Sequence, residues 1–451
     1  MIYFILKIIF KIALKIFYQK IEVKLSQPLP DKGPLLLVAN HPNTFMDPIV
    51  IASLFKQEIY FIAKSTVFSS PFRKWLLQRM NLIPVYRRED GLVVAGANES
   101  TFEKCYEFLN AKGSLLIFPE GNSFNERRLR PLKTGAARIA LGAAARLDFT
   151  QEVKILPIGL NYLEPTRFRS NLLINVAPPI VVNNLASVYQ QDASKAVYQL
   201  TNQIRTELEA NIIHTHSNTD DELVYQVETV FKNHLLTNSE KTDSEQEFQL
   251  TRAIVASLEY FKRHDSERVK NIQHKLKTYL QQIKALHLEE TVFYSPEGKM
   301  HFGKWLFTSI LFLLIGLPLY LFGLLTNYLP YIIPAKVANA LTEEAEFIAP
   351  ILLTTGIFTF PLFYGVELYL FWYFTQAGLL TLLFFLSLPL SGFFVLHYFR
   401  RVKNLQTHLR LQVLLFNDSK VVNTLLKQRE EILIELELAR QQYLQKMQQV
   451  P

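Results

Sequence analysis

The chain has 451 residues, of which 49% are apolar, and a formal net charge of +8. This length predicts two or three structural units, and a single cysteine, Cys105, excludes an intramolecular disulfide framework and suits a reducing compartment. The positive charges are spread out without a basic-aromatic platform, so nucleic acid is not an expected partner. The ten histidines lack the spacing of metal ligands, and no metal site is predicted.

Residues 1–24 are predicted to form an amphipathic helix at a membrane surface. The first eighteen residues are apolar apart from Lys7, Lys11 and Lys15, whose spacing of four places them in one helical stripe. No uncharged run there is long enough to cross a bilayer, and no cleavage site with small residues follows. The first interpretation is an interfacial helix with its lysines toward anionic headgroups. The alternative is a helix packed on the globular domain.

Residues 25–183 are predicted to form an α/β domain, because apolar runs typical of strands alternate with helical stretches. The expected strands are 34–39, 58–63, 82–86, 114–118, 154–160 and 172–176, and the expected helices include 49–55, 96–110 and 134–146.

Two polar loops directly follow expected strands of this domain. The first contains His41 and Asp47, and the second contains Glu120, Gly121 and Ser123. Loops at the carboxyl ends of strands are where α/β sheets place ligands. Histidine can act as a general base, and a carboxylate on its other ring nitrogen would fix the tautomer. Asp47 followed by Pro48 also fits a helix N-cap with proline at the first helical position, and the two roles are compatible.

Four blocks stand out in this part of the chain: residues 40–48, 81–87, 118–123 and 156–159. In sequence and in order they resemble the glycerophospholipid acyltransferases that carry an H-x4-D motif. Five residues rather than four separate the histidine and the aspartate, which is similar to fungal glycerol-3-phosphate acyltransferases. The second block opens with Asn81 where the family has glycine, and asparagine tolerates a left-handed backbone.

The resemblance implies a mixed sheet flanked by helices and assigns roles to particular residues. His41 and Asp47 would be catalytic, Arg87 would hold a phosphate, and Glu120, Gly121 and Ser123 would bind the acceptor. Further cations could enlarge the anionic site, although each also fits an ordinary surface charge: Lys64, Arg127, Arg128, Arg130 and Lys133. No resident cofactor is expected, because the acyl group would come from a thioester co-substrate, acyl-CoA or acyl carrier protein.

The second half of the chain is predicted to be helical and membrane-spanning. Residues 184–300 form a helical region, 301–400 a membrane block and 401–451 an amphipathic tail that packs on the helical region or binds a partner. Three runs lack charges and are long enough to cross a bilayer: Trp305 to Ala335, Phe347 to Val366, and Leu368 to Phe399. Glu367 between two runs marks a short surface turn or, alternatively, a functional intramembrane carboxylate.

The topology of this block stays open at the level of sequence. Lys304 precedes it and Arg400, Arg401 and Lys403 follow it, so both flanks read as cytoplasmic by the positive-inside rule. Three complete spans cannot return the chain to its starting side. Either one run is re-entrant or interfacial, or the flanking charges do not indicate the true orientation of the chain.

Together these features predict a multi-pass membrane acyltransferase of phospholipid biosynthesis whose catalytic domain faces the cytoplasm. Its partners would be membrane lipid, a phosphorylated glycerol and an acyl thioester, and the acceptor would be glycerol 3-phosphate. The alternatives are a 1-acyl-glycerol-3-phosphate or other lysophospholipid acyltransferase and, from another class, a non-catalytic membrane scaffold. The oligomeric state is not predicted.

Overall fold

The computed structural model describes residues 2–85, 97–236, 244–293 and 302–448. The chain divides into two compact units. Unit 1 comprises Met1–His214 and Ala335–Ile357, and unit 2 comprises Thr215–Pro334 and Phe358–Pro451. The segment boundaries given above remain predictions.

Unit 1 is built on a mixed sheet. Within the described residues its eight strands are β1 (Lys20–Leu25), β2 (Leu35–Ala39), β3 (Tyr60–Lys64), β4 (Leu82–Val85), β5 (Ser114–Ile117), β6 (Lys154–Tyr162), β7 (Asn171–Val176) and β8 (Ile180–Val181). The strand order is β1-β7-β6-β2-β5-β3-β4, with β8 also pairing with β6. The run from β4 to β6 is parallel, whereas β7 and β8 are antiparallel to β6. The mixed α/β sheet predicted from the sequence is therefore confirmed.

Six of these strands coincide with predicted ones, and two do not. The sequence of β1, KIEVKL, alternates charged and apolar residues, and the strand lies at the edge of the sheet with most of its residues exposed. An edge strand buries little, so its sequence carries little of the apolar signal that identifies a central strand. The strand β8 has only two residues and depends on its neighbour β6.

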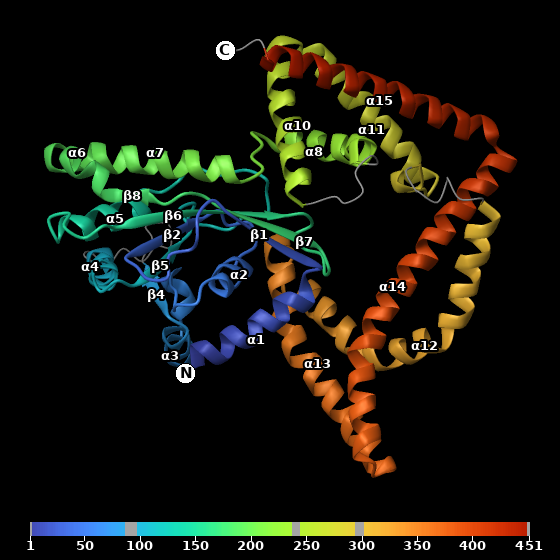
Figure 1. Ribbon diagram of the computed structural model, residues 1–451, viewed down its shortest axis with the longest axis horizontal. Helices are drawn as coiled ribbons and strands as arrows, with labels where there is room; N and C mark the ends of the chain where they lie inside the picture. The colour runs from blue at the N-terminus through green and yellow to red at the C-terminus, as the bar shows by residue number, and fades with distance from the viewer. Residues whose placement is uncertain (1, 86–96, 237–243, 294–301, 449–451) are drawn as a thin grey trace. The chain divides into compact units, whose positions relative to one another are not determined.

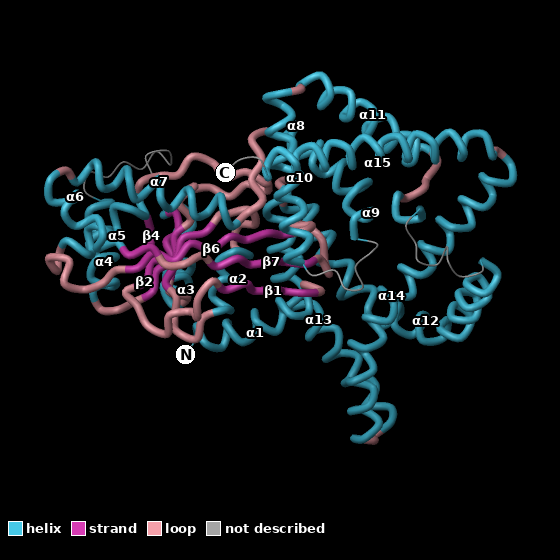
Figure 2. Tube along the Cα trace, turned by 45° about the horizontal axis from the view of Figure 1, so that its top comes forward, coloured by secondary structure: helices cyan, strands magenta, loops and turns pink. Residues whose placement is uncertain are grey.

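Helices cover both faces of the sheet. They are α1 (Ile2–Phe17), α2 (Met46–Leu54), α3 (Pro71–Arg79), α4 (Ala97–Asn110), α5 (Gly135–Ala145), α6 (Ala186–Gln191) and α7 (Ala193–Asn211). In Figure 1, α6 and α7 lie on one face and α1 and α2 on the other, and Figure 2 shows the strands as the layer between them.

The central strand β2 shows why the sheet needs both layers. All five of its residues are buried. Leu36 and Val38 pack with α4, α5 and α7, whereas Leu35, Leu37 and Ala39 pack with α1 and α2. Successive side chains of a strand point to opposite faces, so a continuous apolar run belongs in the middle of a sheet covered on both sides.

The N-terminal helix α1 packs on unit 1, so the alternative of a helix packed on the globular domain is confirmed. Tyr3, Leu14 and Phe17 are buried. The Lys7 ammonium donates to the carbonyl oxygens of Phe55, Lys56 and Gln57 beyond the end of α2, at 2.6, 3.3 and 3.2 Å. The interpretation that all three lysines face headgroups is wrong for Lys7, because a helix C-terminus offers carbonyl groups that attract a cation.

A second apolar face of α1 remains exposed. It consists of Phe4, Ile5, Ile8, Ile9, Ile12 and Ile16. Their spacing places them along one side of the helix. Such a face suits the apolar part of a membrane surface, so packing on the domain and an interfacial position are compatible in one helix.

Unit 2 contains a helical core and most of the membrane block. In its described part, the helices outside the membrane block are α8 (Asn218–Val227), a π-helix (Glu228–Lys232), α9 (Asn233–Leu236), α10 (Ser244–His264), α11 (Ser266–Ala285), a short 3-10 helix (Glu290–Phe293) and α15 (Ser419–Gln448). Leu425, Ile432 and Leu436 of α15 are buried with Leu276 and Tyr279 of α11. The C-terminal tail therefore packs on the helical region, which was one of its two predicted arrangements.

Among the described residues, three helices are long and apolar enough to cross a membrane: α12 (Phe302–Leu341), α13 (Ala345–Thr375) and α14 (Gly378–Asn417). Glu367 lies inside α13, and the chain turns at Gln376 and Ala377 instead. The predicted surface turn at Glu367 is therefore wrong. A single glutamate is a good helix former and does not end an apolar helix, whereas Gln376 has a left-handed backbone with φ of 51°.

Candidate active site

The site begins where β2 ends and the chain turns toward α2. The side chain of Asn40 is hydrogen-bonded twice to the backbone of Leu160 in β6, donating to its oxygen at 3.0 Å and accepting from its nitrogen at 2.7 Å. The next residue, His41, donates its backbone N–H to Glu120 Oε1 at 3.0 Å and accepts from the N–H of Phe124 at 3.1 Å. The backbone that carries His41 is therefore held by β6 and by the loop after β5.

His41 and Asp47 form the predicted pair. The distance between His41 Nδ1 and Asp47 Oδ2 is 2.8 Å. Asp47 is completely buried. Its Oδ2 also accepts the backbone N–H of Asn43 at 2.8 Å, and its Oδ1 accepts the hydroxyl of Tyr162 at 2.7 Å. A buried carboxylate needs such donors, and here they also fix its direction toward the His41 ring.

The interpretation of Asp47 as a helix N-cap is wrong. Helix α2 begins at Met46, its N-cap position is Phe45, and no side chain caps it. Asp47 stands in the first turn of the helix, where a negative charge is favoured by the helix dipole. Its oxygens bind groups of the preceding loop and of β6 rather than the amides of its own helix.

The backbone at Thr44 allows Asp47 to reach His41 although five residues separate them. Its backbone has φ of 38°, a left-handed conformation that a β-branched residue rarely adopts. This conformation costs about 1–2 kcal/mol. Two hydrogen bonds hold it: its N–H donates to Ser123 Oγ at 2.9 Å, and its hydroxyl donates to the Glu346 oxygen at 3.0 Å. The left-handed residue tightens the loop so that Asp47 returns to His41.

The second polar loop stabilises the first through hydrogen bonds. The two carboxylate oxygens of Glu120 accept the backbone N–H groups of His41 and Arg130, both at 3.0 Å. Burial raises the pKa of Glu120, while these N–H groups and His41 act in the opposite direction. Glu120 and Ser123 thus both hold the loop of His41, and their predicted binding of the acceptor stays a prediction.

Gly121 and Asn81 both adopt left-handed conformations, which the sequence suggested for Asn81 alone. Gly121 has φ of 82°, and a Cβ there would lie 2.9 Å from the Lys133 side chain. Only glycine fits both conditions without strain. Asn81 has φ of 64°, which confirms the left-handed turn expected at this position.

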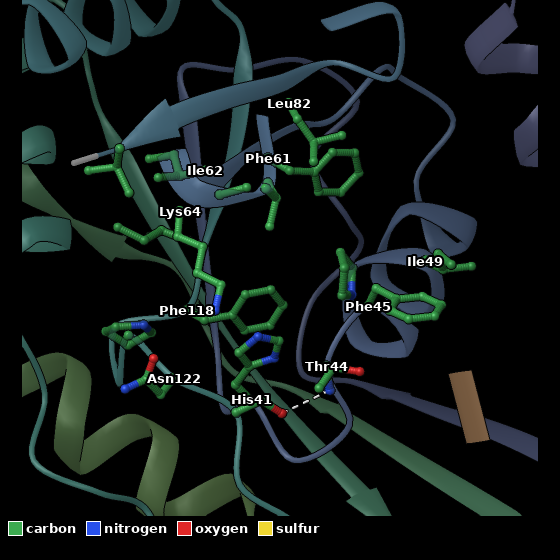
Figure 3. Close-up of a pocket in the computed structure, with 18 of the residues that line it drawn as sticks. His41, Thr44, Phe45, Ile49, Phe61, Ile62, Lys64, Leu82, Phe118 and Asn122 are labelled. Atoms are coloured by element: carbon green, nitrogen blue, oxygen red, sulfur yellow. Dashed lines mark hydrogen bonds between the residues drawn. The ribbon is translucent and has the colours of Figure 1, made fainter. Parts of the chain in front are cut away.

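A large cavity opens at His41. Its volume is about 1480 Å³, above the roughly 300–1,000 Å³ typical of small-molecule pockets. Apolar side chains line most of it, including Leu6, Phe10, Phe45, Ile49, Phe61, Leu82, Phe102, Ile117 and Ile139. His41 stacks on Phe118 with ring centroids 3.8 Å apart, and Figure 3 shows the two rings side by side with Lys64 reaching toward them from β3.

The predicted cations separate into two groups. Lys64 and Lys133 line the cavity, together with Arg138, which no sequence pattern predicted. The other arginines of the second loop point to a different partner: Arg128 and Arg130 each bind Glu126 at 2.8 Å, and they do not line the cavity, nor does Arg127. The predicted phosphate ligand Arg87 lies outside the described residues.

Two residues of the site carried no sequence signal. Tyr162 is at the end of β6, and its link to Asp47 joins residues 115 positions apart. Arg138 is on the first turns of α5, where a single arginine has no distinguishing neighbours. The available clue was position alone: Tyr162 follows the block 156–159 on the strand next to β2.

The fold and the site define a class, an α/β domain with a His–Asp pair at the carboxyl end of a parallel strand and an apolar cavity beside it. The family model described as Acyltransferase matches residues 20–161. Glycerol-3-phosphate O-acyltransferase 2 of Saccharomyces cerevisiae is 37% identical over 112 residues, which cover 25% of this chain and 15% of the yeast protein. This α/β domain is therefore similar to acyltransferases over the matched residues.

One further curated protein and one solved structure are similar to parts of this chain. The chloroplastic 1-acyl-sn-glycerol-3-phosphate acyltransferase BAT2 of Brassica napus is 31% identical over 139 residues, covering 31% of this chain and 38% of the plant protein. The crystal structure of the acyltransferase PlsC from Thermotoga maritima overlaps with 43% of this chain and 79% of its own, at 19% identity and a TM-score of 0.30. The matched segments thus span 15% and 38% of the two curated relatives.

Proposed function

We propose that the chain is a membrane acyltransferase that transfers a fatty acyl group from a thioester to a hydroxyl group of glycerol 3-phosphate. The observation that carries this proposal is the His41–Asp47 pair at 2.8 Å, on the wall of a cavity that is otherwise mostly apolar. An acyl chain needs an apolar cavity, and the attacking hydroxyl needs a base beside the reacting end of that chain.

The chemistry follows from the orientation of His41. Its Nδ1 is engaged by Asp47, so Nε2 is the ring nitrogen left to accept the proton of the glycerol hydroxyl. The hydroxyl oxygen then forms a bond to the thioester carbonyl carbon, and the carbon–sulfur bond breaks. The imidazolium returns the proton to the leaving thiolate, so the histidine is regenerated. Asp47 stabilises the transient imidazolium and holds the tautomer.

The acceptor phosphate would lie among the cations of the cavity. Lys64, Lys133 and Arg138 line it, and ammonium and guanidinium groups bind phosphate oxygens. The similarity to a yeast enzyme named for glycerol 3-phosphate favours that acceptor. The similarity to a plant 1-acyl-glycerol-3-phosphate acyltransferase keeps the monoacylated acceptor as the second candidate.

The membrane helices would keep the cavity close to its lipid substrates and products. The three apolar helices and the exposed apolar face of α1 both support membrane association. We propose a multi-pass protein whose catalytic domain faces the cytoplasm, where acyl-CoA or acyl carrier protein would donate the acyl group. No resident cofactor is needed for this reaction.

The test uses the purified full-length chain. Glycerol 3-phosphate and 1-acyl-glycerol 3-phosphate are supplied in turn, each with acyl-CoA and with acyl carrier protein as donor. The expected result is ester formation on glycerol 3-phosphate that the His41→Ala variant lowers by about 10²–10⁴-fold, the usual contribution of a general base. Full activity of the folded variant would overturn the mechanism. No transfer to either acceptor by the intact chain would favour the non-catalytic scaffold.

A further inference from the structure

A segment of the membrane block belongs to unit 1. Ala335–Ile357 groups with the α/β domain, although it joins helices that continue in unit 2. It contains the end of α12 and the first turns of α13. The family match ends at residue 161, so this segment lies outside the matched part of the chain.

Apolar packing and one hydrogen bond hold the beginning of α13 against the α/β domain. Ala349 is completely buried and Leu353 is 4% exposed, and both lie in the core cluster that contains Leu35, Leu37 and Met46. The Thr44 hydroxyl donates to the backbone oxygen of Glu346. This hydrogen bond joins α13 to the residue whose left-handed backbone closes the His41–Asp47 loop.

Another side of the same turns faces the cavity. Phe347 and Thr354 line it. They are seven residues apart, which places them on one stripe of a helix, away from the stripe of Ala349 and Leu353. The Thr354 hydroxyl donates to the Pro350 oxygen of its own helix at 2.8 Å. Thr354 is therefore a small lining residue that has no polar partner across the cavity among the described residues.

We propose that Phe347 and Thr354 form a wall of the acyl-chain cavity and determine which acyl chain lengths the enzyme accepts. This inference rests on the proposed function and deepens it, because it assigns donor specificity to the membrane block rather than to the α/β domain alone. A larger side chain at Thr354 would occupy space that the end of a long chain needs. A smaller side chain at position 347 would enlarge the cavity.

The experiment compares two substitutions on adjacent residues of the same type. Thr354→Phe adds a ring to the cavity wall, whereas Thr355→Phe adds the same ring at a position that does not line the cavity. Both full-length variants and the unaltered chain are assayed for kcat/KM with short, medium and long acyl-CoA donors at a fixed acceptor concentration. Burial of one methylene group contributes about fourfold to binding, which sets the scale of the effect.

The expected result is that Thr354→Phe keeps activity with short chains and loses about tenfold or more with long ones, the equivalent of two displaced methylene groups. Thr355→Phe should keep the original profile. If Thr354→Phe does not fold, Phe347→Ala provides the opposite test, with a relative gain for long chains.

Each contrary outcome has a distinct meaning. The assignment of the wall would be overturned if Thr354→Phe and Thr355→Phe changed the dependence of kcat/KM on chain length equally. It would also be overturned if neither Thr354→Phe nor Phe347→Ala changed that dependence. Both outcomes would leave the proposed function intact. Absence of acyl transfer by the unaltered chain with every donor would overturn the proposed function and this inference with it.

Discussion

Two buried polar clusters, one in each unit, show how the proposed active site differs from a cluster that only joins helices. In unit 1, Asp47 accepts hydrogen bonds from the Asn43 backbone and the Tyr162 hydroxyl and pairs with His41. In unit 2, Asn327 donates to the oxygens of Gly323 and Leu388 and accepts from the Tyr364 hydroxyl at 2.6 Å. Both polar side chains are buried and well bonded.

The difference lies in where each cluster ends. The Asp47 cluster ends at His41, which lines a cavity and whose Nδ1, but not Nε2, is engaged by Asp47. The Asn327 cluster joins only neighbouring helices, and glycines at positions 323 and 392 allow the close approach: a Cβ at Gly323 would lie 2.6 Å from the Ser391 oxygen. Small residues and interhelical hydrogen bonds hold membrane helices together. Burial of a polar group does not identify a site, but a titratable end facing a cavity does.

Apart from replacement of His41 itself, Asp47→Asn should have the largest effect on activity. The carboxamide is as large as the carboxylate, but it cannot stabilise an imidazolium and can hold His41 in the wrong tautomer. In a comparable His–carboxylate pair this change lowers kcat by about 10⁴-fold. The measurement is kcat/KM together with thermal unfolding. A folded variant with activity within tenfold of the original would show that Asp47 serves the loop and not the reaction.

Tyr162→Phe should have an intermediate effect. Burial and the nearby negative charge of Asp47 raise the pKa of Tyr162 well above its usual value, so its hydroxyl stays protonated and continues to donate. Loss of this one hydrogen bond, worth about 0.5–1.5 kcal/mol, should lower kcat by about threefold to tenfold. KM should not change, because Tyr162 does not line the cavity.

The neighbouring Tyr18 provides the matched control for that substitution. The ring centroids of Tyr18 and Tyr162 lie 6.0 Å apart, and Tyr18 is almost fully buried. Its hydroxyl interacts with that of Tyr162, but among the described residues it donates no hydrogen bond to Asp47. Tyr18→Phe should therefore leave kcat near its original value. Equal losses of kcat in the two variants would indicate a general packing effect and would remove the positioning role of Tyr162.

Asn327→Leu should have the smallest effect on activity. The change leaves the Tyr364 hydroxyl without its acceptor and removes hydrogen bonds between α12 and α14, so it should destabilise the folded state by about 1–3 kcal/mol. The kcat of the folded fraction should not change. Thermal unfolding in detergent and activity per folded molecule separate the two quantities. A loss of kcat without a loss of stability would indicate that the Asn327 cluster also takes part in the reaction.

Much of unit 1 could be predicted from local sequence. The strands β2, β5 and β6 are continuous apolar runs, because a strand covered on both faces has no polar side, and such a run is visible in any short window. The left-handed turn at Asn81 was predictable because few residues tolerate that backbone. The helix N-cap at Asp47 was mispredicted, because whether a side chain turns toward its own helix or toward a distant tyrosine is not a local property.

The candidate reactive residues, their order in the motifs and the three apolar helices follow from residue identity, spacing and length. The partners that complete the site depend instead on how distant segments pack together. Asp47 meets Tyr162 across 115 residues of sequence, and Thr44 meets Glu346 across 302. Contacts of this range come from the packing of strands and helices into one core, so no local pattern encodes them.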